Sequence, residues 1–540
     1  MARNTLLTKR LDLSTALSPW IVLLPVCALL TWLFWPVTGA DFVADDYVFL
    51  TTARMVNEPL AAFWQSHFYE PYYFRPIGVM SWWLATRLFG LDYAPHSLIN
   101  LVLHCVNAAL LFVMLRALAL RASAIAAGVM LFALGPVAFA AMLWPSNRFD
   151  LLAVAFLLVQ AIATVRALQG RSLAIPVAAL AALAACWSKE GAYPVATAMA
   201  FIVLATNSVP WRLRVVLFAM LGGTISGAFF WRHCIITEAY AVTGVDPLGR
   251  VIDGAVAMAS SLPRLIELVI GAKSTLWLGW GLLAAVLISL IQSRRASGVS
   301  RGLLGGAVLV FLAAFIAQTP LAKVFAVMLD GGSFGTVTFA RFYYAPWVAF
   351  SVVVALVLAR GRLGGFAAFA VMGVTAVASL AMRPLGESFV AWTKEEITPM
   401  SIAATRLVDS SGDSPCVFVL FGTQITQPFF RMFSDVTVKS LSVNPAKTWR
   451  CYVMTESTPW LFAFPANATP DDLLLRKITD AAGVAKADSV WGGIRYRYRL
   501  PTKDLANLLG ARFFDWRDGR FVEVTEEVRA GARKVASRDW

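Results

Sequence analysis

Long apolar stretches alternate with short polar turns over the first 383 residues of the chain. A helix that crosses a bilayer needs about twenty mostly apolar residues, and about eleven stretches meet this requirement. They are residues 19–38, 97–116, 123–143, 149–166, 172–188, 192–207, 213–231, 274–292, 302–320, 343–359 and 363–382. The pattern therefore predicts a polytopic α-helical membrane protein with a transmembrane domain over residues 1–383.

Lysine and arginine recur at every second turn between these stretches. Short loops that remain in the cytoplasm are enriched in these residues, so the bias predicts orientation. The basic turns contain Arg3, Lys9, Arg10, Arg116, Arg121, Arg166, Arg171, Arg212, Arg214, Arg294, Arg295, Arg301, Arg360 and Arg362. We expect all of them, and the N-terminus, on the cytoplasmic side. An odd number of spans then places the C-terminus outside.

Three longer segments are predicted to lie outside: a first loop over residues 39–96, a middle loop over 232–273 and a tail over 384–540. In the first loop, "PIGVMSWWLATRLFG" (76–90) is apolar and rich in tryptophan but too short to span, which predicts an interfacial helix. The tail mixes β-rich runs ("CVFVLFG", "WRCYVM", "RYRYRL", "RFVEV") with one helical run, "PDDLLLRKITDAAG". This mixture predicts a small extracytoplasmic α+β domain.

Composition agrees with a membrane protein. The chain is 59% hydrophobic and 14% charged, whereas a soluble domain is about half apolar and a quarter charged. The net charge of +14 would suit nucleic acid, but the cytoplasmic bias of basic residues explains it, so no nucleic-acid partner is expected. Six cysteines show neither CxxC nor metal spacing. Cys416 and Cys451 would be free to pair if the tail is extracytoplasmic.

Adjacent carboxylates follow the first span, in "DFVADDYVFL" (41–50). Asp45 and Asp46 cannot both ionise cheaply without a partner, so one is expected to have a raised pKa and to be poised as a base. The alternative is a solvated loop start at the edge of the membrane.

A polar stripe follows in "PHSLINLVLHCVNAALL". His96, Asn100 and His104 recur every four residues, with Asn107 one turn further, so they share one helix face. Such a stripe either lines an aqueous cavity or forms hydrogen bonds between helices. A zinc site is not expected, because no third ligand has suitable spacing.

Further charged and aromatic residues lie at other predicted outer helix ends. They are Arg75 in "YYFRPIG", Arg148 and Asp150 in "LWPSNRFDLL", Lys189 and Glu190 in "CWSKEGAYP", and Arg341 and Tyr344 in "FARFYYAP". A guanidinium suits a phosphate, which it binds with two parallel hydrogen bonds. Each residue alone is equally consistent with an interfacial anchor or an edge ion pair. Together they predict an outer cavity that binds an anionic lipid headgroup.

The order of these motifs resembles the GT-C superfamily of integral-membrane glycosyltransferases. The branch with protein O-mannosyltransferases and transmembrane-and-TPR O-mannosyltransferases is the most similar. The "RP…H-x3-N-x3-H" block is the most specific part, followed by the "DD" pair and the "SKE" turn, and the resemblance covers roughly residues 20–350. The tail differs from the TPR branch because it has no repeat of about 34 residues, which leaves the acceptor open.

The resemblance implies a transferase that moves a hexosyl or pentosyl group from a polyprenyl-phosphate donor to an acceptor hydroxyl, usually with inversion. The acceptor would be protein, lipopolysaccharide or another envelope glycan. Asp45 or Asp46 would be the general base, with Arg75, Lys189 and Arg341 on the phosphate. The remaining expected substrate-binding residues are His96, Asn100, His104, Arg148, Asp150, Glu190 and Tyr344. A divalent cation (Mg or Mn) is compatible with the acid pair, and the expected location is a bacterial inner membrane with a periplasmic tail.

Two other functions fit parts of the pattern. A transporter or flippase for polyprenyl-linked glycolipid would also need a polar cavity and cations. It would need neither two acids at the outer edge nor a large outer domain, and would be expected to show internal repeats. A non-catalytic scaffold for envelope assembly would tolerate loss of the acids.

Overall fold

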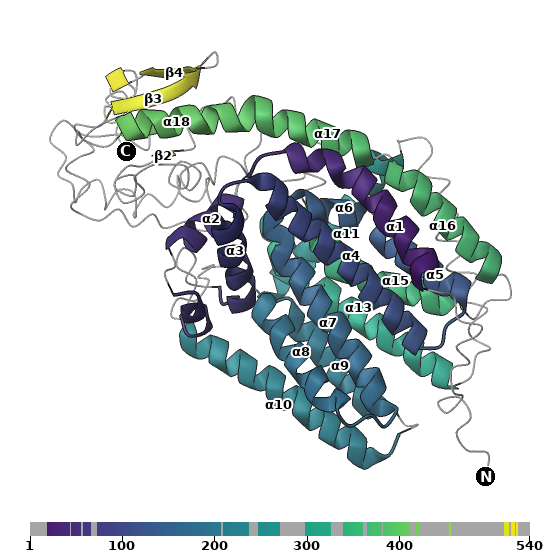
Figure 1. Ribbon diagram of the computed structural model, residues 1–540. Coiled ribbons are helices and arrows are strands. Elements are labelled where there is room, and N and C mark those ends of the chain that lie inside the picture. The colour runs from purple at the N-terminus through teal and green to yellow at the C-terminus, as the bar shows by residue number, and fades with distance from the viewer. Residues whose placement is uncertain are drawn as a thin grey trace, which may run out of the picture.

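The computed structural model describes residues 19–43, 45–55, 58–65, 73–206, 209–236, 247–270, 298–325, 339–359, 364–380 and 382–410, and short segments at 417–420, 453–454, 512–517, 520–523 and 525–526. Most of this part of the chain is helical. The helices form a bundle, and α17 and α18 run along one end of it, where the strands also lie (Figure 1).

The first half of the chain contributes most of the bundle. Its elements are α1 (Pro19–Phe34), η2 (Trp35–Gly39), α2 (Asp45–Met55), η3 (Pro59–Phe63), α3 (Pro76–Phe89), α4 (Tyr93–Ala117), α5 (Ala122–Ala133), α6 (Pro136–Leu143), η4 (Pro145–Asn147), α7 (Arg148–Leu168), α8 (Ala174–Ser188), α9 (Ala192–Ala205) and α10 (Trp211–Ile235). Helix α7 is central, since it packs against both α4 and α8.

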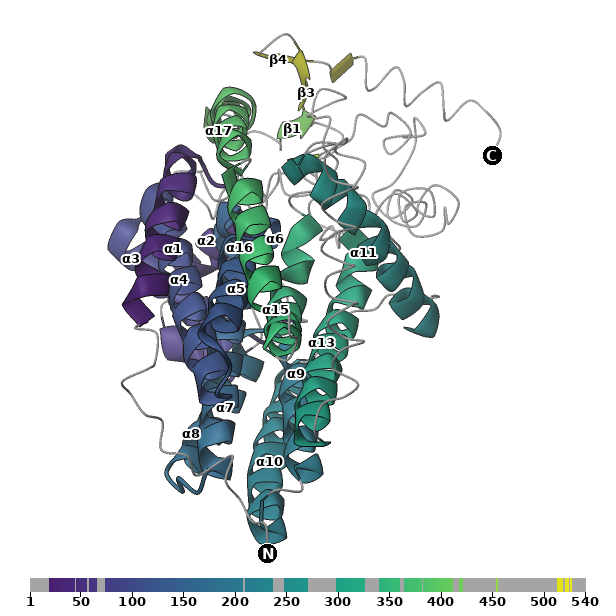
Figure 2. The same cartoon turned by 90° about the vertical axis from the view of Figure 1, so that its right-hand side faces the viewer.

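The second half adds helices along the other face of the bundle, as Figure 2 shows for α11, α13, α15 and α16. The elements are α11 (Pro247–Ile270), α13 (Gly298–Phe325), η6 (Ala340–Tyr343), α15 (Tyr344–Leu358), α16 (Gly364–Leu380), α17 (Met382–Trp392), the π-helix η7 (Thr393–Ile397) and α18 (Thr398–Ser410). Helix α13 packs against α11 and α15.

Seven helical stretches of the described chain are long and apolar enough to cross a membrane. They are Ile21–Gly39, Tyr93–Ala117, Pro145–Leu168, Trp211–Ile235, Gly302–Thr319, Ala340–Leu358 and Gly364–Glu395. Each coincides with one of the spans predicted from sequence. The prediction of a polytopic helical membrane protein is therefore confirmed.

Three further predicted spans are bent or shorter than a full membrane span. Residues 123–143 were predicted as one span, and the structure divides them into α5 and α6, which meet at a bend of 42°. Pro136 is the first residue of α6, and because proline has no backbone N–H, it cannot continue the hydrogen-bond ladder of α5. Helices α8 and α9 have 15 and 14 residues. At 1.5 Å per residue they are about 22 Å long, shorter than the ~30 Å hydrocarbon layer.

The number of eleven spans remains a prediction, because residues 274–292 lie outside the described chain. Helix α3 confirms the helix expected near residues 76–90. Its Trp82 and Val79 are buried against the bundle, whereas Leu84 and Leu88 are exposed on the opposite side. An outward apolar face is what an interfacial helix requires.

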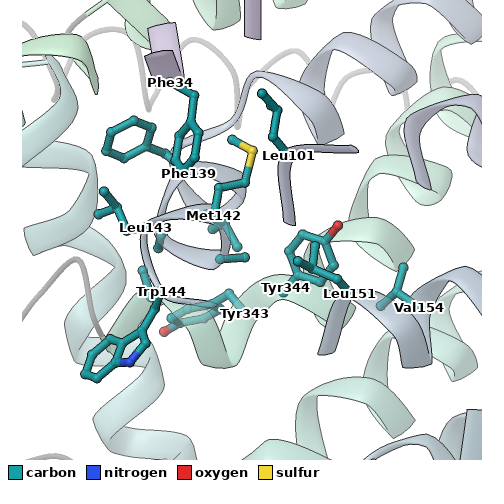
Figure 3. Packing of buried hydrophobic residues seen from close by; sticks show 14 of the residues in the cluster. Phe34, Leu101, Phe139, Met142, Leu143, Trp144, Leu151, Val154, Tyr343 and Tyr344 are labelled. Atoms are coloured by element: carbon teal, nitrogen blue, oxygen red, sulfur yellow. The ribbon is translucent and has the colours of Figure 1, made fainter. Parts of the chain in front are cut away.

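Tight packing holds the turns at one end of the bundle. Phe34 meets Phe139 edge to face at 5.8 Å between ring centroids, and Trp144, Tyr343 and Tyr344 lie close to the same buried cluster (Figure 3). Helices α3 and α7 approach closely because Gly78 has no side chain. A Cβ there would lie about 2.0 Å from a ring atom of Phe149.

The strands described in the tail form one mixed sheet in the order β2-β1-β3-β4. Strands β1 (Val417–Leu420), β2 (Val453–Met454) and β4 (Arg520–Glu523) fall within three of the predicted β-rich runs, and β3 is Arg512–Arg517. Strand β1 is parallel to β2 and β3, and β4 is antiparallel to β3. The "RYRYRL" run, the helical run 470–483, Cys416 and Cys451 lie outside the described residues, so the separate α+β domain stays a prediction.

Candidate active site

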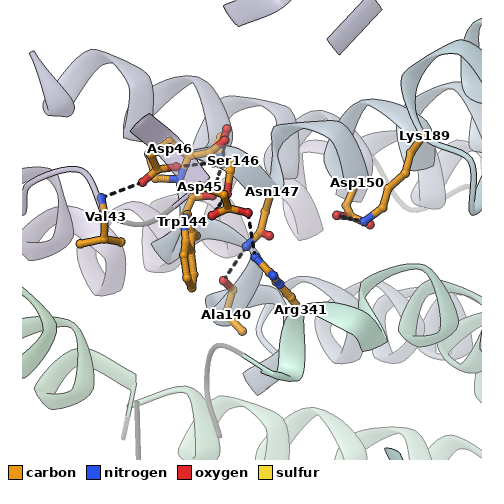
Figure 4. Close-up of polar contacts among 12 residues, drawn as sticks. Val43, Asp45, Asp46, Ala140, Trp144, Ser146, Asn147, Asp150, Lys189 and Arg341 are labelled. Atoms are coloured by element: carbon orange, nitrogen blue, oxygen red, sulfur yellow. Dashed lines mark hydrogen bonds and ion pairs between the residues drawn. The ribbon is translucent and has the colours of Figure 1, made fainter. Parts of the chain in front are cut away.

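The two adjacent acids occupy the first turn of α2, where the positive end of the helix favours carboxylates. Asp46 is fully buried. Its Oδ1 accepts a hydrogen bond from the backbone N–H of Ser146 at 2.7 Å, and its Oδ2 accepts one from the N–H of Val43 at 3.1 Å (Figure 4). The bond from Ser146 joins α2 to η4, and the bond from Val43 fixes the segment that leads into α2.

Burial is the main influence on Asp46. Together with the neighbouring charge of Asp45, it raises the pKa of Asp46 well above its usual range, although the two N–H donors and Arg148 act in the opposite direction. The result is a carboxyl group whose two oxygens are held by the backbone, which suits positioning better than proton exchange with a substrate.

Asp45 differs from its neighbour because its side chain is 22% exposed. Its Oδ1 accepts a hydrogen bond from Ser146 Oγ at 3.0 Å, and its Oδ2 lies 3.4 Å from Arg341 Nη1 (Figure 4). The Arg341 guanidinium lies over the ring of Trp144, 4.9 Å from its centroid. The tertiary structure thus brings together a solvent-accessible carboxylate and a cation that are 296 positions apart in the sequence.

A second cluster of charged residues lies at the turn between α8 and α9. Lys189 Nζ binds Asp150 Oδ2 at 2.5 Å. Arg75 binds Glu190 through two parallel contacts, Nε to Oε2 at 2.8 Å and Nη2 to Oε1 at 2.5 Å. Because Lys189 and Glu190 are adjacent, this one turn connects α7 to the start of α3 through two ion pairs.

The pairing with Arg75 determines the ionisation of Glu190. Burial raises the pKa of Glu190, but the charge and hydrogen bonds of Arg75, and then Lys189, outweigh it and lower the pKa to about 2. Glu190 is therefore ionised throughout the physiological range.

The polar stripe of α4 is buried between helices. Asn100 Nδ2 donates to Trp144 O at 3.0 Å, His104 Nδ1 lies 2.8 Å from Tyr344 Oη, and Asn107 Nδ2 donates to Tyr344 Oη at 3.0 Å. All of these side chains have negligible exposure. The arrangement favours hydrogen bonding between helices over the lining of a cavity.

Arg148 belongs to the same buried network. Its guanidinium donates to Ser81 O at 3.3 Å and His96 O at 3.1 Å, and lies over the Trp82 ring at 4.8 Å. It also contacts Asn100 Oδ1 at 3.4 Å. Arg148 therefore joins α3, α4 and α7, and its contacts are with protein groups.

Two groups of contacts that hold the acids and the segment before them carry no signal in the amino-acid sequence. Ser146, in the "WPSN" turn, binds both Asp45 and Asp46, and a serine in a polar turn carries no distinguishing signal. Asp41 Oδ2 accepts a hydrogen bond from Thr398 Oγ1 at 2.8 Å, and the Asp41 N–H donates to Thr393 Oγ1 at 3.3 Å. Because these threonines lie more than 350 positions away, no local pattern reveals them.

The acid pair does not fit a divalent cation as it is arranged. Each of its four carboxylate oxygens already has a protein donor: Ser146 Oγ, Arg341, Ser146 N and Val43 N. Over the described chain, no group of three or more His, Cys, Asp or Glu side chains is placed to hold a metal ion.

No family model matches the sequence, and no curated protein does either. Two solved structures are similar in fold. One is the Archaeoglobus fulgidus oligosaccharyltransferase tethered to an acceptor peptide containing the NVT sequon (11% identity, 94% of this chain and 74% of that chain, TM-score 0.49). The other is ArnT from Cupriavidus metallidurans bound to undecaprenyl phosphate (15% identity, 86% and 95%, TM-score 0.33). Both TM-scores lie below 0.5, so neither likeness bears on the function of this chain.

Proposed function

We propose that this protein is a membrane glycosyltransferase of GT-C type. It moves a sugar from a polyprenyl-phosphate-linked donor to an acceptor hydroxyl, with inversion at the anomeric carbon. One observation carries the proposal: Asp45 is a partly exposed carboxylate held by Ser146 on one oxygen and by Arg341 on the other. An accessible base beside a cation, at the end of a transmembrane bundle, is what this transfer needs.

In this proposal Asp45 is the general base. It accepts the proton of the acceptor hydroxyl while that oxygen attacks the anomeric carbon and the bond to the lipid phosphate breaks. A base must lie within hydrogen-bond reach of the proton it takes, and Asp45 is the acid of the pair that solvent reaches. Asp46, bound by two backbone N–H groups, orients the first turn of α2.

Arg341 is the proposed partner of the leaving phosphate. Negative charge develops on that phosphate in the transition state, so a fixed cation nearby lowers the barrier. The 3.4 Å contact between Arg341 and Asp45 is longer than the 2.5 Å contacts of Lys189 with Asp150 and Arg75 with Glu190. Exchange of a carboxylate for a phosphate is therefore easiest at Arg341, and the two tighter pairs form the wall of the site.

The test compares a deletion strain restored with the wild type, with Asp45→Asn or with a control, Glu387→Gln, which removes an exposed acid on α17. Mass spectrometry of surface glycans and secreted proteins gives the readout. We expect one sugar mass to vanish on deletion, to return with the wild type and the control, and to stay reduced by roughly 10²- to 10⁴-fold in Asp45→Asn, the usual contribution of a general base.

Full restoration of the sugar mass by Asp45→Asn would show that Asp45 is not the general base. The transporter or scaffold would then be the better account of the protein, since neither needs a proton acceptor. The mass of the sugar and its carrier would identify donor and acceptor together.

A further inference from the structure

A groove lies at the other end of α7, away from the acid pair. It has a volume of about 730 Å³ between α4, α7 and α8. Apolar side chains form its wall, among them Val113 of α4, Ile162 of α7 and Val177 of α8, and two arginines, Arg166 and Arg171, lie at its edge. We call this the α7–α8 groove. Arg166 lies 18 positions after Arg148, the first residue of α7, so at 1.5 Å per residue the basic edge of the groove is about 27 Å from the helix end that follows Ser146.

The turn that ends α7 holds the two arginines together. Gly170 has φ of +90°, its N–H bonds Ala167 O at 2.9 Å, and the N–H of Arg171 bonds Arg166 O at 3.1 Å. This pair of bonds is the Schellman motif, which depends on a glycine because other residues rarely adopt a positive φ. The second bond joins the two arginine backbones directly, so the spacing of their side-chain origins is fixed.

Charge and polarity at the groove are complementary to an amphipathic anion. None of the residues that line it is acidic. Arg166 and Arg171 are exposed, and α8 begins beside them with no side-chain cap, adding the positive end of its dipole. Leu173 is 84% exposed and Val177 46% exposed, and both line the groove together with Arg166 and Arg171, so an uncovered apolar surface adjoins the two basic residues.

We propose that the α7–α8 groove binds an anionic phospholipid. One acyl chain lies along the apolar wall, and the phosphate is bound by Arg166 and Arg171. A guanidinium binds a phosphate with two charge-assisted hydrogen bonds, and basic pockets between transmembrane helices on the predicted cytoplasmic side suit such headgroups. If the arginines served only to set membrane orientation, they would attract anionic lipid no more than other exposed arginines of the predicted cytoplasmic side do.

The test uses native mass spectrometry of the full-length protein in detergent, titrated with phosphatidylglycerol or with phosphatidylcholine of the same chains. We expect the wild type to retain phosphatidylglycerol preferentially. Arg166→Gln/Arg171→Gln is expected to weaken its binding on the order of tenfold, because both charge-assisted contacts are lost. The matched control is Arg121→Gln/Arg212→Gln, which removes two exposed arginines that do not line the groove and should bind like the wild type.

A second variant, Val177→Trp, fills the groove and keeps both arginines, so it should also lose the lipid. Three results would overturn the proposal: unchanged binding in the double glutamine variant, unchanged binding in Val177→Trp, or displacement of the lipid by inorganic phosphate at matched concentration. The last would identify a site for a free anion. Because the groove is remote from Asp45, glycan transfer and lipid retention are separate readouts.

Discussion

Asp45 and Asp46 show how neighbouring residues of one type acquire different surroundings. They share a helix turn, but their hydrogen-bond donors differ. Backbone N–H groups bind both oxygens of Asp46, whereas the Ser146 hydroxyl and the Arg341 guanidinium bind those of Asp45. Exposure follows the same division, 22% for the Asp45 side chain and none for Asp46. The assignment of base to one and support to the other rests on this difference.

Asp46→Asn is expected to destabilise the protein. The substitution replaces one accepting oxygen with an NH₂ group, which then faces a backbone N–H that has no other acceptor, and an unpaired buried donor costs about 1–3 kcal/mol. Thermal unfolding in detergent measures the effect. Asp45→Asn is the matched comparison, and a smaller loss for Asp46→Asn than for Asp45→Asn would contradict the positioning role.

The lowered pKa of Glu190 predicts that the stability of the protein falls as the pH becomes acidic. Its pKa of about 2 in the folded protein lies below the unfolded value of about 4.3, so its ionisation stabilises the fold above that value. The contribution is lost as pH falls from about 4.3 to about 2. Glu190→Gln should be less stable than the wild type at pH 7, and the difference should shrink across this window.

Thermal unfolding of both proteins from pH 7 to pH 3 gives the measurement. Glu387→Gln, which alters an exposed ion pair on α17, is the control and should follow the wild type throughout. A gap between Glu190→Gln and the wild type that stays constant down to pH 3 would show that the pair with Arg75 does not depend on this charge.

At the scale of elements, α17, η7 and α18 form a continuous rod that contacts the segment before α2. Thr393 lies at the start of the π-helix and Thr398 directly after it, and both bind Asp41. A π-helix within a longer helix often marks a functional position. Through Asp41 the rod reaches the residues that lead into Asp45, and α18 also contacts β1 and β4.

Thr398→Val tests whether the rod positions the acid pair. Loss of the hydroxyl removes a 2.8 Å hydrogen bond to Asp41, and we expect a several-fold lower kcat with little change in KM, because the base is displaced while the donor still binds. Thr405→Val is the control, since Thr405 bonds only its own helix, at Ser401 O. Equal activity in the two variants would show that the rod does not position the acid pair.

At the scale of the molecule, the charged residues of the candidate site lie at the ends of the helices of an apolar bundle. The acid pair, Arg341 and the turn at Lys189 all lie at helix ends, where charged groups avoid the hydrocarbon layer. The α7–α8 groove lies at the far end of α7. The two sites therefore belong to opposite sides of the membrane if the helices span it as predicted.

Cysteine labelling in intact cells tests this orientation. Ile402→Cys on α18 and Ser172→Cys in the turn before α8, each in a background without the native cysteines, should give opposite results with an impermeant reagent. Residue 402 is expected to react from outside and residue 172 only after permeabilisation. The reverse pattern would overturn both the topology and the extracytoplasmic site.

The amino-acid sequence by itself determined that the chain is a polytopic helical membrane protein, because apolar runs of span length are local signals. It also indicated the charged turns from which the site is built. Local pattern did not reveal the bend at Pro136. It also did not reveal that His104 and Asn107 both form hydrogen bonds with Tyr344.

Only the tertiary structure decided how the charged turns combine. Arg341 meets Asp45 across 296 positions, Glu190 meets Arg75 across 115, and Thr398 meets Asp41 across 357. A sequence pattern records which side chains share a helix face or a turn. Which turns become neighbours depends on the packing of whole helices, and that packing distinguishes the accessible Asp45 from the buried Asp46.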